Sequence, residues 1–266
     1  MTIVNQQNAG SGNGTRYYGV NSTWTLNLGF TPTPGNTLIL LMGLVNGTNI
    51  AFATFSGSNM NSSFVNGTTN AGIVCLSVVV PPSPSSAINI IFGSGGTQFS
   101  TILLEVSGLT NVAPDQMAHS TGSGSVYGSG TTATTTQLSE LWINVYAYYN
   151  ASTGNEPTGT SPTNGYGLLN SGVSVKPYQS GWVWTTGTMS VVSPLTSSGL
   201  LASYKTVSTM GAAGGSVSDL SVHTNTWYGA ALAFFGPVAG ATVSLIDILN
   251  AGIKRYPPLR NHNERG

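Results

Sequence analysis

Short apolar segments recur from residue 23 to residue 235 of this 266-residue chain, and clusters of Gly, Pro, Ser and Asn separate them. The segment WTLNLGF (24–30) places an apolar residue at every second position, which is the pattern of a strand buried on one face. The segment TLILLMGLV (37–45) is almost continuously apolar, as in a central strand covered on both faces. Because no segment before residue 240 has helical periodicity, the sequence predicts an all-β fold.

Further segments have the composition of strands. They cover residues 50–55, 73–80, 87–92, 100–106, 141–149, 166–175, 182–184, 189–193, 200–207 and 227–235. Two stretches rich in small polar residues, 122–136 and 150–165, are expected to be long, mobile loops. Many short strands between frequent turns predict a large antiparallel two-sheet β-sandwich. No linker divides the strands, so residues 21–236 are expected to form one domain after a flexible segment at residues 1–20.

Charged residues are rare in this chain. They make up 5% of it, with seven Lys and Arg and seven Asp and Glu, whereas about 25% is ordinary for a soluble domain. Ser, Thr and Asn take their place, so we expect a neutral surface covered with hydroxyl and amide groups. Without net charge there is no overall field to attract DNA or an anionic membrane, and we expect neither as a partner. The lack of self-repulsion favours assembly.

The C-terminal segment, residues 237–266, has a different pattern. Ser244 and Asp247 are spaced like the capping box of a short helix. An apolar face at helical spacing consists of Leu245, Ile246, Leu249 and Ile253. The last thirteen residues contain four of the seven cations, Lys254, Arg255, Arg260 and Arg265. We expect a short helix and an extended arm that dock on a neighbouring subunit, with a disordered terminus as the alternative.

Residues 227–246 contain no charge over a length that matches one membrane span of about 20 residues. Gly236 and Pro237 interrupt this stretch, and Asp247 and Asn250 make the residues after it polar. The first part of the stretch also has the pattern of a closing strand. A strand is therefore the favoured interpretation, and a membrane anchor is the alternative.

Few residues are candidates for chemistry. Glu105 ends an apolar strand, where a carboxylate is expected to accept backbone N–H groups. The alternative is that Glu105 pairs with Asp115 or Glu140 as the two acids of a glycosidase or lyase. Cys75, the only cysteine, is expected in the core. No metal-ligand spacing relates the three histidines, which are His119, His223 and His262. We therefore assign no catalytic, cofactor-binding or metal-binding residue.

Two clusters of aromatic residues are candidates for binding. They contain Tyr178, Trp182 and Trp184 in one segment and Tyr146, Tyr148 and Tyr149 in another. Exposed rings next to amide side chains form a platform for a sugar ring. The favoured interpretation is instead that these rings fill the core between two sheets, where aromatic residues bury the largest areas. The first cluster remains a candidate contact for a glycan or a neighbouring subunit.

Four longer segments occur in a recognisable order along the chain. They are TPTPGNTLILLMGLVNG, FSTILLEVSGLTNVAPDQMAHSTGSG, TTTQLSELWINVYAYYN and NTWYGAALAFFG. This arrangement resembles a diffuse family of β-sandwich modules from structural proteins of phages and other prokaryotic viruses and from related surface proteins. The resemblance covers about residues 20–236 and consists mostly of packing motifs. It implies a jelly-roll-like or lectin-like sandwich that builds, decorates or projects from a particle.

The expected function is that of a structural protein of a prokaryotic virus particle, in the capsid, a decoration, a spike or the tail surface. Such a protein would act as a homo-oligomer with other virion proteins. The first residues lack a basic region followed by an apolar run, so we expect synthesis in the host cytoplasm without a signal peptide. A carbohydrate-binding module for host-surface glycans is the alternative, and a glycan-degrading enzyme is a third hypothesis.

Overall fold

The structure is a computed structural model, which describes residues 1–10, 23–45, 50–65, 71–93, 98–150, 161–168, 182–184, 187–189, 197–218 and 225–237. The described residues form antiparallel strands and the turns between them, and they contain no helix. The all-β prediction is therefore confirmed. The predicted C-terminal helix and arm lie outside the described residues.

The first part of the chain forms two antiparallel sheets. The strands are β1 (Thr2–Gly10), β2 (Thr23–Asn27), β3 (Thr37–Val45), β4 (Ile50–Phe55), β5 (Ser58–Asn59), β6 (Asn61–Val65), β7 (Ala71–Val79), β8 (Ala87–Phe92) and β9 (Gln98–Ser107). An inner sheet has the order β1-β9-β3-β7-β6, and an outer sheet has the order β2-β8-β4-β5. We call these two sheets the N-terminal unit.

The second part of the chain forms the C-terminal unit. Its strands are β10 (Pro114–Gly124), β11 (Val126–Thr134), β12 (Glu140–Asn150), β13 (Ser161–Pro162), β14 (Gly167–Leu168), β17 (Ser197–Val207), β18 (Ala212–Ser218) and β19 (Asn225–Phe235). The inner sheet has the order β10-β19-β12-β17-β14, and the outer sheet has the order β11-β18-β13. A separate hairpin pairs β15 (Trp182–Trp184) with β16 (Gly187–Met189).

The two units have the same topology. If β1, β9, β3, β7 and β6 are replaced by β10, β19, β12, β17 and β14, the first inner sheet becomes the second. In the same way, β2, β8 and β4 of the first outer sheet correspond to β11, β18 and β13 of the second. Strand β5 and the β15–β16 hairpin are the described strands without a counterpart. The chain therefore contains one sandwich topology twice in succession.

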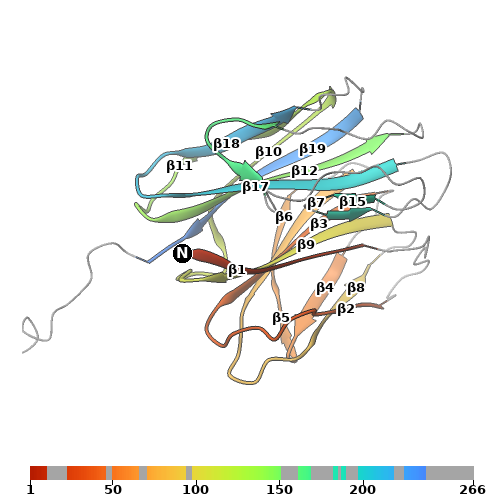
Figure 1. Ribbon diagram of the computed structural model, residues 1–266, viewed down its shortest axis with the longest axis vertical. Helices are drawn as coiled ribbons and strands as arrows, with labels where there is room; N and C mark the ends of the chain where they lie inside the picture. The colour runs from red at the N-terminus through yellow and green to blue at the C-terminus, as the bar shows by residue number, and fades with distance from the viewer. Residues whose placement is uncertain are drawn as a thin grey trace, which may run out of the picture.

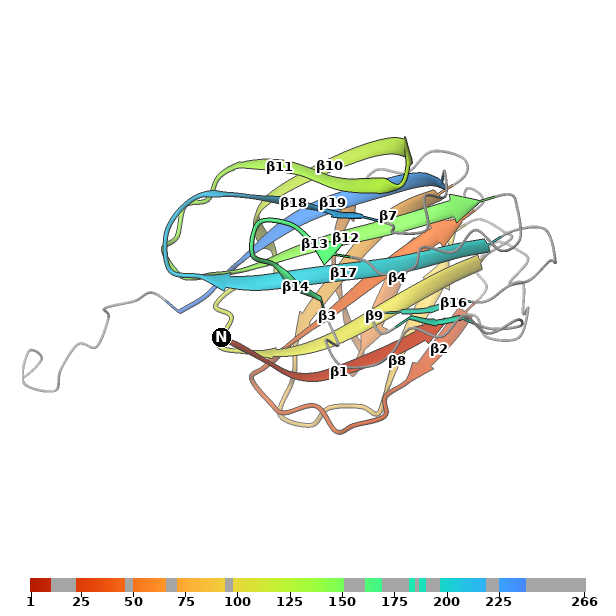
Figure 2. The same cartoon turned by 45° about the horizontal axis from the view of Figure 1, so that its top comes forward.

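The four sheets stack as layers, with the inner sheets face to face in the middle and the outer sheets at the two ends (Figure 1). At the central interface β3 faces β12, β9 faces β17, and β7 faces β19. Since β17 is the counterpart of β7, and β19 is the counterpart of β9, these contacts are reciprocal. This is the pattern of a two-fold axis between the units. The turned view in Figure 2 shows β12 and β17 lying over β3 and β9.

A continuous apolar core fills the space between the inner sheets. Alternate residues of β3 and β12, such as Ile39 and Ile143, point into it and are fully buried. Gly43 faces this core, and a Cβ atom there would come within 3.0 Å of Leu200 Cδ1 and 3.3 Å of Ala147 Cβ. A second apolar core lies between the two sheets of the N-terminal unit. The inner sheets are therefore covered on both faces, as the continuous apolar pattern of residues 37–45 predicts.

The number of sheets differs from the two-sheet prediction, because four sheets stack on one another. Alternation along a strand shows that one face is buried, but it does not show what covers that face. The prediction treated all strands as members of one pair of sheets. The structure instead contains two sandwiches of equal topology that share a central core.

Two segments that were predicted to be flexible contain strands. Residues 1–20 were expected to be a flexible segment, and the part of it that the structure describes, residues 1–10, contains β1, which pairs with β9 along its length. Residues 122–136 were expected to be a mobile loop, but β10 and β11 continue through most of this stretch. These strands were not recognised because β1 is mostly polar and because β10 and β11 are rich in Gly, Ser and Thr. β1 and β10 lie at the edge of an inner sheet, and β11 lies in an outer sheet. There a strand needs only one covered face.

The uncharged stretch at residues 227–246 begins with β19, so the strand interpretation of its first part is confirmed. β19 lies between β10 and β12 in the inner sheet of the C-terminal unit. Among the residues that the structure describes, no helix is long and apolar enough to span a membrane.

Candidate functional site: two buried carboxylates and a polar layer

Glu105 lies on β9 and is fully buried in the N-terminal unit. Its carboxylate accepts hydrogen bonds from Asn5 Nδ2 at 2.5 Å, Asn36 Nδ2 at 2.6 Å and the Thr33 backbone N–H at 2.8 Å. Burial alone would raise the pKa of Glu105, but these hydrogen bonds outweigh it and hold the pKa below its ordinary value. The prediction that Glu105 accepts a backbone N–H is confirmed, and the side chain links β1, β9 and the turn before β3.

Glu140 begins β12 and is also fully buried. Its Oε2 atom accepts a hydrogen bond from Trp142 Nε1 at 2.7 Å, whereas Oε1 has no hydrogen-bond partner among the described residues. Burial raises the pKa of Glu140, and the negative charge of the neighbouring Asp115 raises it further. Hydrogen bonds from Trp142 and Thr135 oppose this shift without cancelling it.

Asp115 lies at a bulge near the start of β10. Its two carboxylate oxygens accept hydrogen bonds from the Thr136 backbone N–H at 2.6 Å and the Thr136 hydroxyl at 2.9 Å. Asp115 and Glu140 are therefore neighbours at one end of the C-terminal unit. Glu105 lies on the opposite side of the inner sheets, facing the other outer sheet. The structure does not bring Glu105 together with either acid, and it gives no support to the glycosidase pairing.

Polar side chains are buried between the two sheets of the C-terminal unit. Asn144 and Tyr146 on β12 and Ser203 on β17 are each completely buried. Asn144 lies directly opposite Ser203 in the β12–β17 ladder. From the outer sheet, the Ser129 hydroxyl lies close to Tyr146, and it accepts a hydrogen bond from the Gly215 backbone N–H at 2.9 Å. We call Asn144, Tyr146 and Ser203 the polar layer.

Lys205 is the only Lys or Arg in the part of the chain that the structure describes. Its Nζ atom lies 4.9 Å from the ring centre of Trp142 and 4.6 Å from that of Tyr166. The ammonium group also donates a hydrogen bond to the Asn164 carbonyl at 2.9 Å. Burial lowers the pKa of Lys205. These contacts hold Lys205 against the C-terminal unit, where the two rings favour the charged form.

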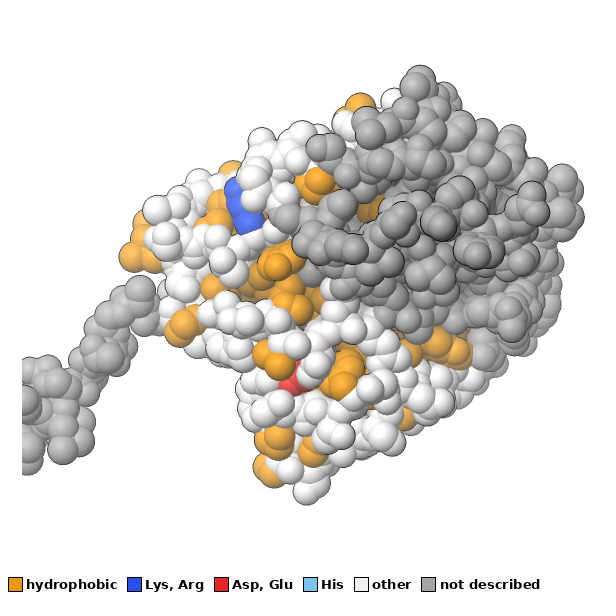
Figure 3. All heavy atoms as spheres, in the orientation of Figure 1, with side chains coloured by type: hydrophobic (Ala, Val, Ile, Leu, Met, Phe, Trp, Pro, Cys, Tyr) orange, Lys and Arg blue, Asp and Glu red, His pale blue; other side chains and the backbone are white. Residues whose placement is uncertain are grey.

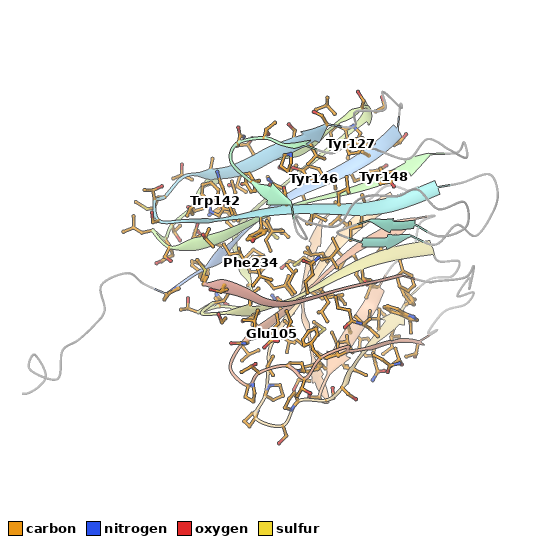
Figure 4. All side chains as sticks on the ribbon, viewed as in Figure 1. Glu105, Tyr127, Trp142, Tyr146, Tyr148 and Phe234 are labelled. Carbon is orange, nitrogen blue, oxygen red and sulfur yellow. The ribbon has the colours of Figure 1, made fainter. Side chains whose placement is uncertain are left out.

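Two residues of the second aromatic cluster, Tyr146 and Tyr148, fill a core, as the favoured interpretation predicted, and the side chain of Tyr149 lies outside the described residues. Tyr146 and Tyr148 are buried between the sheets of the C-terminal unit, and Tyr148 stacks on Tyr127 of β11 with ring centres 6.0 Å apart. Figure 4 shows these three tyrosines in the C-terminal unit and Glu105 in the N-terminal unit. In the first cluster, Trp182 and Trp184 lie on β15, but their side chains are outside the described residues. Tyr178 also lies outside them, so this candidate contact stays a prediction.

The remaining candidate residues are the cysteine and the three histidines. Cys75 is fully buried in the central core, as predicted, and burial raises its pKa to about 12. His119 lies on β10, while His223 and His262 are outside the described residues. Within the described ranges, no group of three or more His, Cys, Asp or Glu residues is placed to hold a metal ion.

Comparisons with known proteins give no relative of this chain. No protein-family model matches the sequence, and neither the search of curated proteins nor the search of solved structures finds a match.

The polar layer was not predicted from the sequence. The segment ELWINVYAYYN (140–150) has the general character of an apolar strand, so we expected only a buried face. Within it, Glu140, Asn144 and Tyr146 are separated by even numbers of residues and therefore lie on one face of the strand. Polar residues at even spacing were the available signal that one face of this strand is polar.

Proposed function

We propose that this chain is a structural subunit of a prokaryotic virus particle and that it acts through self-assembly and subunit contacts. The observation that carries this proposal is that the acidic side chains of the described part hold the fold together. The three carboxylates of the described part, Glu105, Asp115 and Glu140, all make hydrogen bonds within the fold. Glu105 and Glu140 are also inaccessible to a substrate. An architectural role uses the two sandwiches directly, without a reactive group.

The segments that resemble viral modules support the proposal. TPTPGNTLILLMGLVNG contains β3, and FSTILLEVSGL contains most of β9, whereas the other two segments contain β12 and β19. β3–β9 and β12–β19 are the corresponding central pairs of the two units. The hydrogen bond from Asn36 to Glu105 joins the first two segments. The resemblance therefore concerns residues that build the double sandwich, which is what a packing motif of a structural module does.

The surface of the described residues also suits assembly. Figure 3 shows a face with very little blue or red and with separate orange patches on a mostly white surface. Exposed apolar side chains on this and other faces include Val4, Phe52, Val79, Met117, Val126, Leu138 and Met210. Contacts between such neutral surfaces depend on shape and hydrogen bonding more than on charge, so they change little with salt concentration.

Assembly of the purified full chain tests the proposal. We expect light scattering to show a mass that rises with protein concentration, and electron microscopy to show regular oligomers or particles. A second sample that lacks residues 254–266 tests the predicted arm, and we expect it to fold but to assemble only at higher concentration. The matched control replaces Lys254, Arg255, Arg260 and Arg265 with Gln in the full chain. A full chain that remains monomeric at every concentration would contradict the proposal.

The carbohydrate-binding alternative now depends on the first aromatic cluster alone. A glycan array with the wild-type chain and the variants Trp182→Ala and Trp184→Ala tests it. We expect no glycan to bind. Binding that is lost in either variant, while circular dichroism shows an unchanged fold, would favour the alternative over a purely structural role.

A further inference from the structure

The unsatisfied polar groups of this protein are concentrated in one place. Among the described residues, every buried side-chain nitrogen or oxygen without a hydrogen-bond partner lies on one face of one sheet. The atoms are Glu140 Oε1, Asn144 Nδ2 and Oδ1, Tyr146 OH, Ser203 Oγ and Trp227 Nε1. This face belongs to the inner sheet of the C-terminal unit and packs against its outer sheet. A buried polar atom without a partner destabilises the fold, because it loses the hydrogen bonds to water that it makes in the unfolded chain.

The polar layer brings four of these atoms together. Asn144 and Ser203 are direct neighbours across the β12–β17 ladder, and Tyr146 follows Asn144 on the same face. Ser203 and Ser129 lie close enough to the Tyr146 hydroxyl, and Asn144 to the Tyr166 hydroxyl, to influence the pKa values of the two tyrosines, but none of these pairs has the geometry of a hydrogen bond. The Asn144 amide offers both a donor and an acceptor, and each hydroxyl can act as either. The cluster can therefore bind a small molecule that both donates and accepts hydrogen bonds.

The spacing of the sheets limits the size of this molecule. A Cβ atom at Gly215 of the outer sheet would lie 2.8 Å from Asn144 Nδ2. A Cβ atom at Gly229 of the inner sheet would lie 1.8 Å from the Gly128 carbonyl oxygen of the outer sheet. The two backbones therefore approach too closely next to the cluster to admit a sugar or another organic ligand. Water is the smallest molecule that matches these groups, because it donates two hydrogen bonds and accepts two.

We propose that the polar layer is a binding site for internal water, with at least one ordered molecule that bridges Asn144 to Ser203 or Tyr146. A buried water commonly makes about three hydrogen bonds to polar groups that would otherwise be unpaired. In this site it satisfies the Asn144 amide and the two hydroxyls together. The water acts as a structural ligand that joins the inner sheet to the outer sheet, and this role does not depend on the proposed function.

A crystal structure of the full chain at high resolution tests the proposal directly. We expect ordered water within about 3.2 Å of the Asn144 side chain and of Ser203 Oγ or Tyr146 OH. The proposal is overturned if Asn144, Tyr146 and Ser203 bond directly to one another or to the outer sheet with no water between them. This measurement needs no variant, so it decides the question even if every substitution prevents folding.

Magnetic relaxation dispersion of the water nuclei in a protein solution gives a second measurement, because it detects water molecules that stay bound for a long time. We expect the wild-type chain to show a signal from long-lived bound water, and the variants Ser203→Ala and Tyr146→Phe to reduce it. The matched control is Tyr148→Phe, which removes a hydroxyl from the same strand outside the polar layer and should leave the signal unchanged. Equal signals in the wild type, Ser203→Ala and Tyr146→Phe would contradict the proposal.

Discussion

The N-terminal and C-terminal units have the same topology but hold their outer sheets in different ways. In the N-terminal unit the fully buried residues between the sheets are apolar apart from Thr101 and Glu105, and neither of these has an unpartnered buried atom. In the C-terminal unit the corresponding layer contains all the unpartnered buried polar atoms of the described part. One topology therefore accommodates two kinds of packing, because strand order does not determine which side chains lie between the sheets.

The two units differ in what separates the inner sheet from the outer sheet. On the outward faces of β3–β9 and β12–β19, Leu44 pairs with Phe99 in the N-terminal unit, and Tyr146 pairs with Gly229 in the C-terminal unit. Phe99 packs edge-on against Trp24, with ring centres 4.6 Å apart, and side chains separate the sheets. At Gly229 the backbones of the two sheets are in direct contact. The N-terminal layer is held by side chains, and the C-terminal layer depends on glycine.

Each unit also places one buried carboxylate at the same end of its central pair. Leu38 pairs with Glu105 in the N-terminal unit, whereas Glu140 pairs with Phe235 in the C-terminal unit. The acid therefore lies on opposite strands of the two pairs. β1 brings the Asn5 amide to Glu105, while its counterpart β10 brings the Asp115 carboxylate close to Glu140. Burial raises the pKa of both acids. At Glu105 the hydrogen bonds outweigh this effect, whereas at Glu140 they do not, and the charge of Asp115 adds to the increase.

The largest expected effect is that of Gly229→Phe, which places an aromatic side chain like Phe99 of the N-terminal unit between the sheets of the C-terminal unit. In Gly229→Phe the Cβ atom alone would collide with the Gly128 carbonyl oxygen, so the outer sheet cannot dock. We expect a loss of more than about 4 kcal/mol in the free energy of unfolding, or no folded protein. Calorimetry measures this loss. Gly229→Ala adds only the Cβ atom, so we expect a smaller loss of stability.

The control for the Gly229 variants is Gly93→Ala, where the nearest atom to the new Cβ lies at an ordinary 3.6 Å. We expect this control to change the melting temperature little. If Gly229→Ala were as stable as Gly93→Ala, the two backbones would not be in the close contact that distinguishes the C-terminal layer.

The reverse change removes a ring from the N-terminal layer. Phe99→Ala deletes a buried side chain that packs against Trp24 and Phe92, and we expect it to cost about 3–5 kcal/mol. Denaturant unfolding measures this cost. The matched control is Phe52→Ala, which removes the same side chain from an exposed position on β4 and should cost much less. Equal costs would show that apolar packing does not hold the N-terminal outer sheet.

A smaller effect is expected for Glu105→Gln, because an amide replaces the carboxylate that accepts three hydrogen bonds. We expect a loss of about 1–3 kcal/mol at pH 7. The pKa of Glu105 is lower in the folded chain, so its contribution is complete above the unfolded pKa and is lost as the pH falls through the folded pKa. Unfolding curves across this acidic range should therefore converge for the wild type and the variant. A difference that is independent of pH would contradict this explanation.

The smallest effect, with the opposite sign, is expected for Glu140→Gln. The pKa of Glu140 is higher in the folded chain, so the wild-type fold becomes relatively less stable as the pH rises from the unfolded pKa through the folded pKa. An uncharged Gln avoids this loss and can still accept the Trp142 hydrogen bond. We therefore expect the variant to gain stability relative to the wild type between acidic and neutral pH. A relative loss over that range would show that the two carboxylates behave alike.

The sequence by itself determined the strands of the inner sheets and part of one site. Residues 37–45 were identified as a central strand because a continuous apolar run needs two covered faces, and residues 141–149 and 227–235 were also identified as strands. The hydrogen bonding of Glu105 was also predictable, since an acid at the end of an apolar strand needs donors. The low charge and the single buried cysteine likewise followed from composition.

Only the tertiary structure decided how these strands are combined. Period-two alternation specifies a face but not a partner, so the repeated topology, the four layers and the meeting of Asp115 with Glu140 depend on contacts between distant segments. The strands β10, β11 and β18 are rich in Gly, Ser and Thr, and locally such segments are indistinguishable from loops. Glycines of β11 and β18 lie where the outer sheet approaches the inner sheet closely, and that close approach exists only in the folded chain.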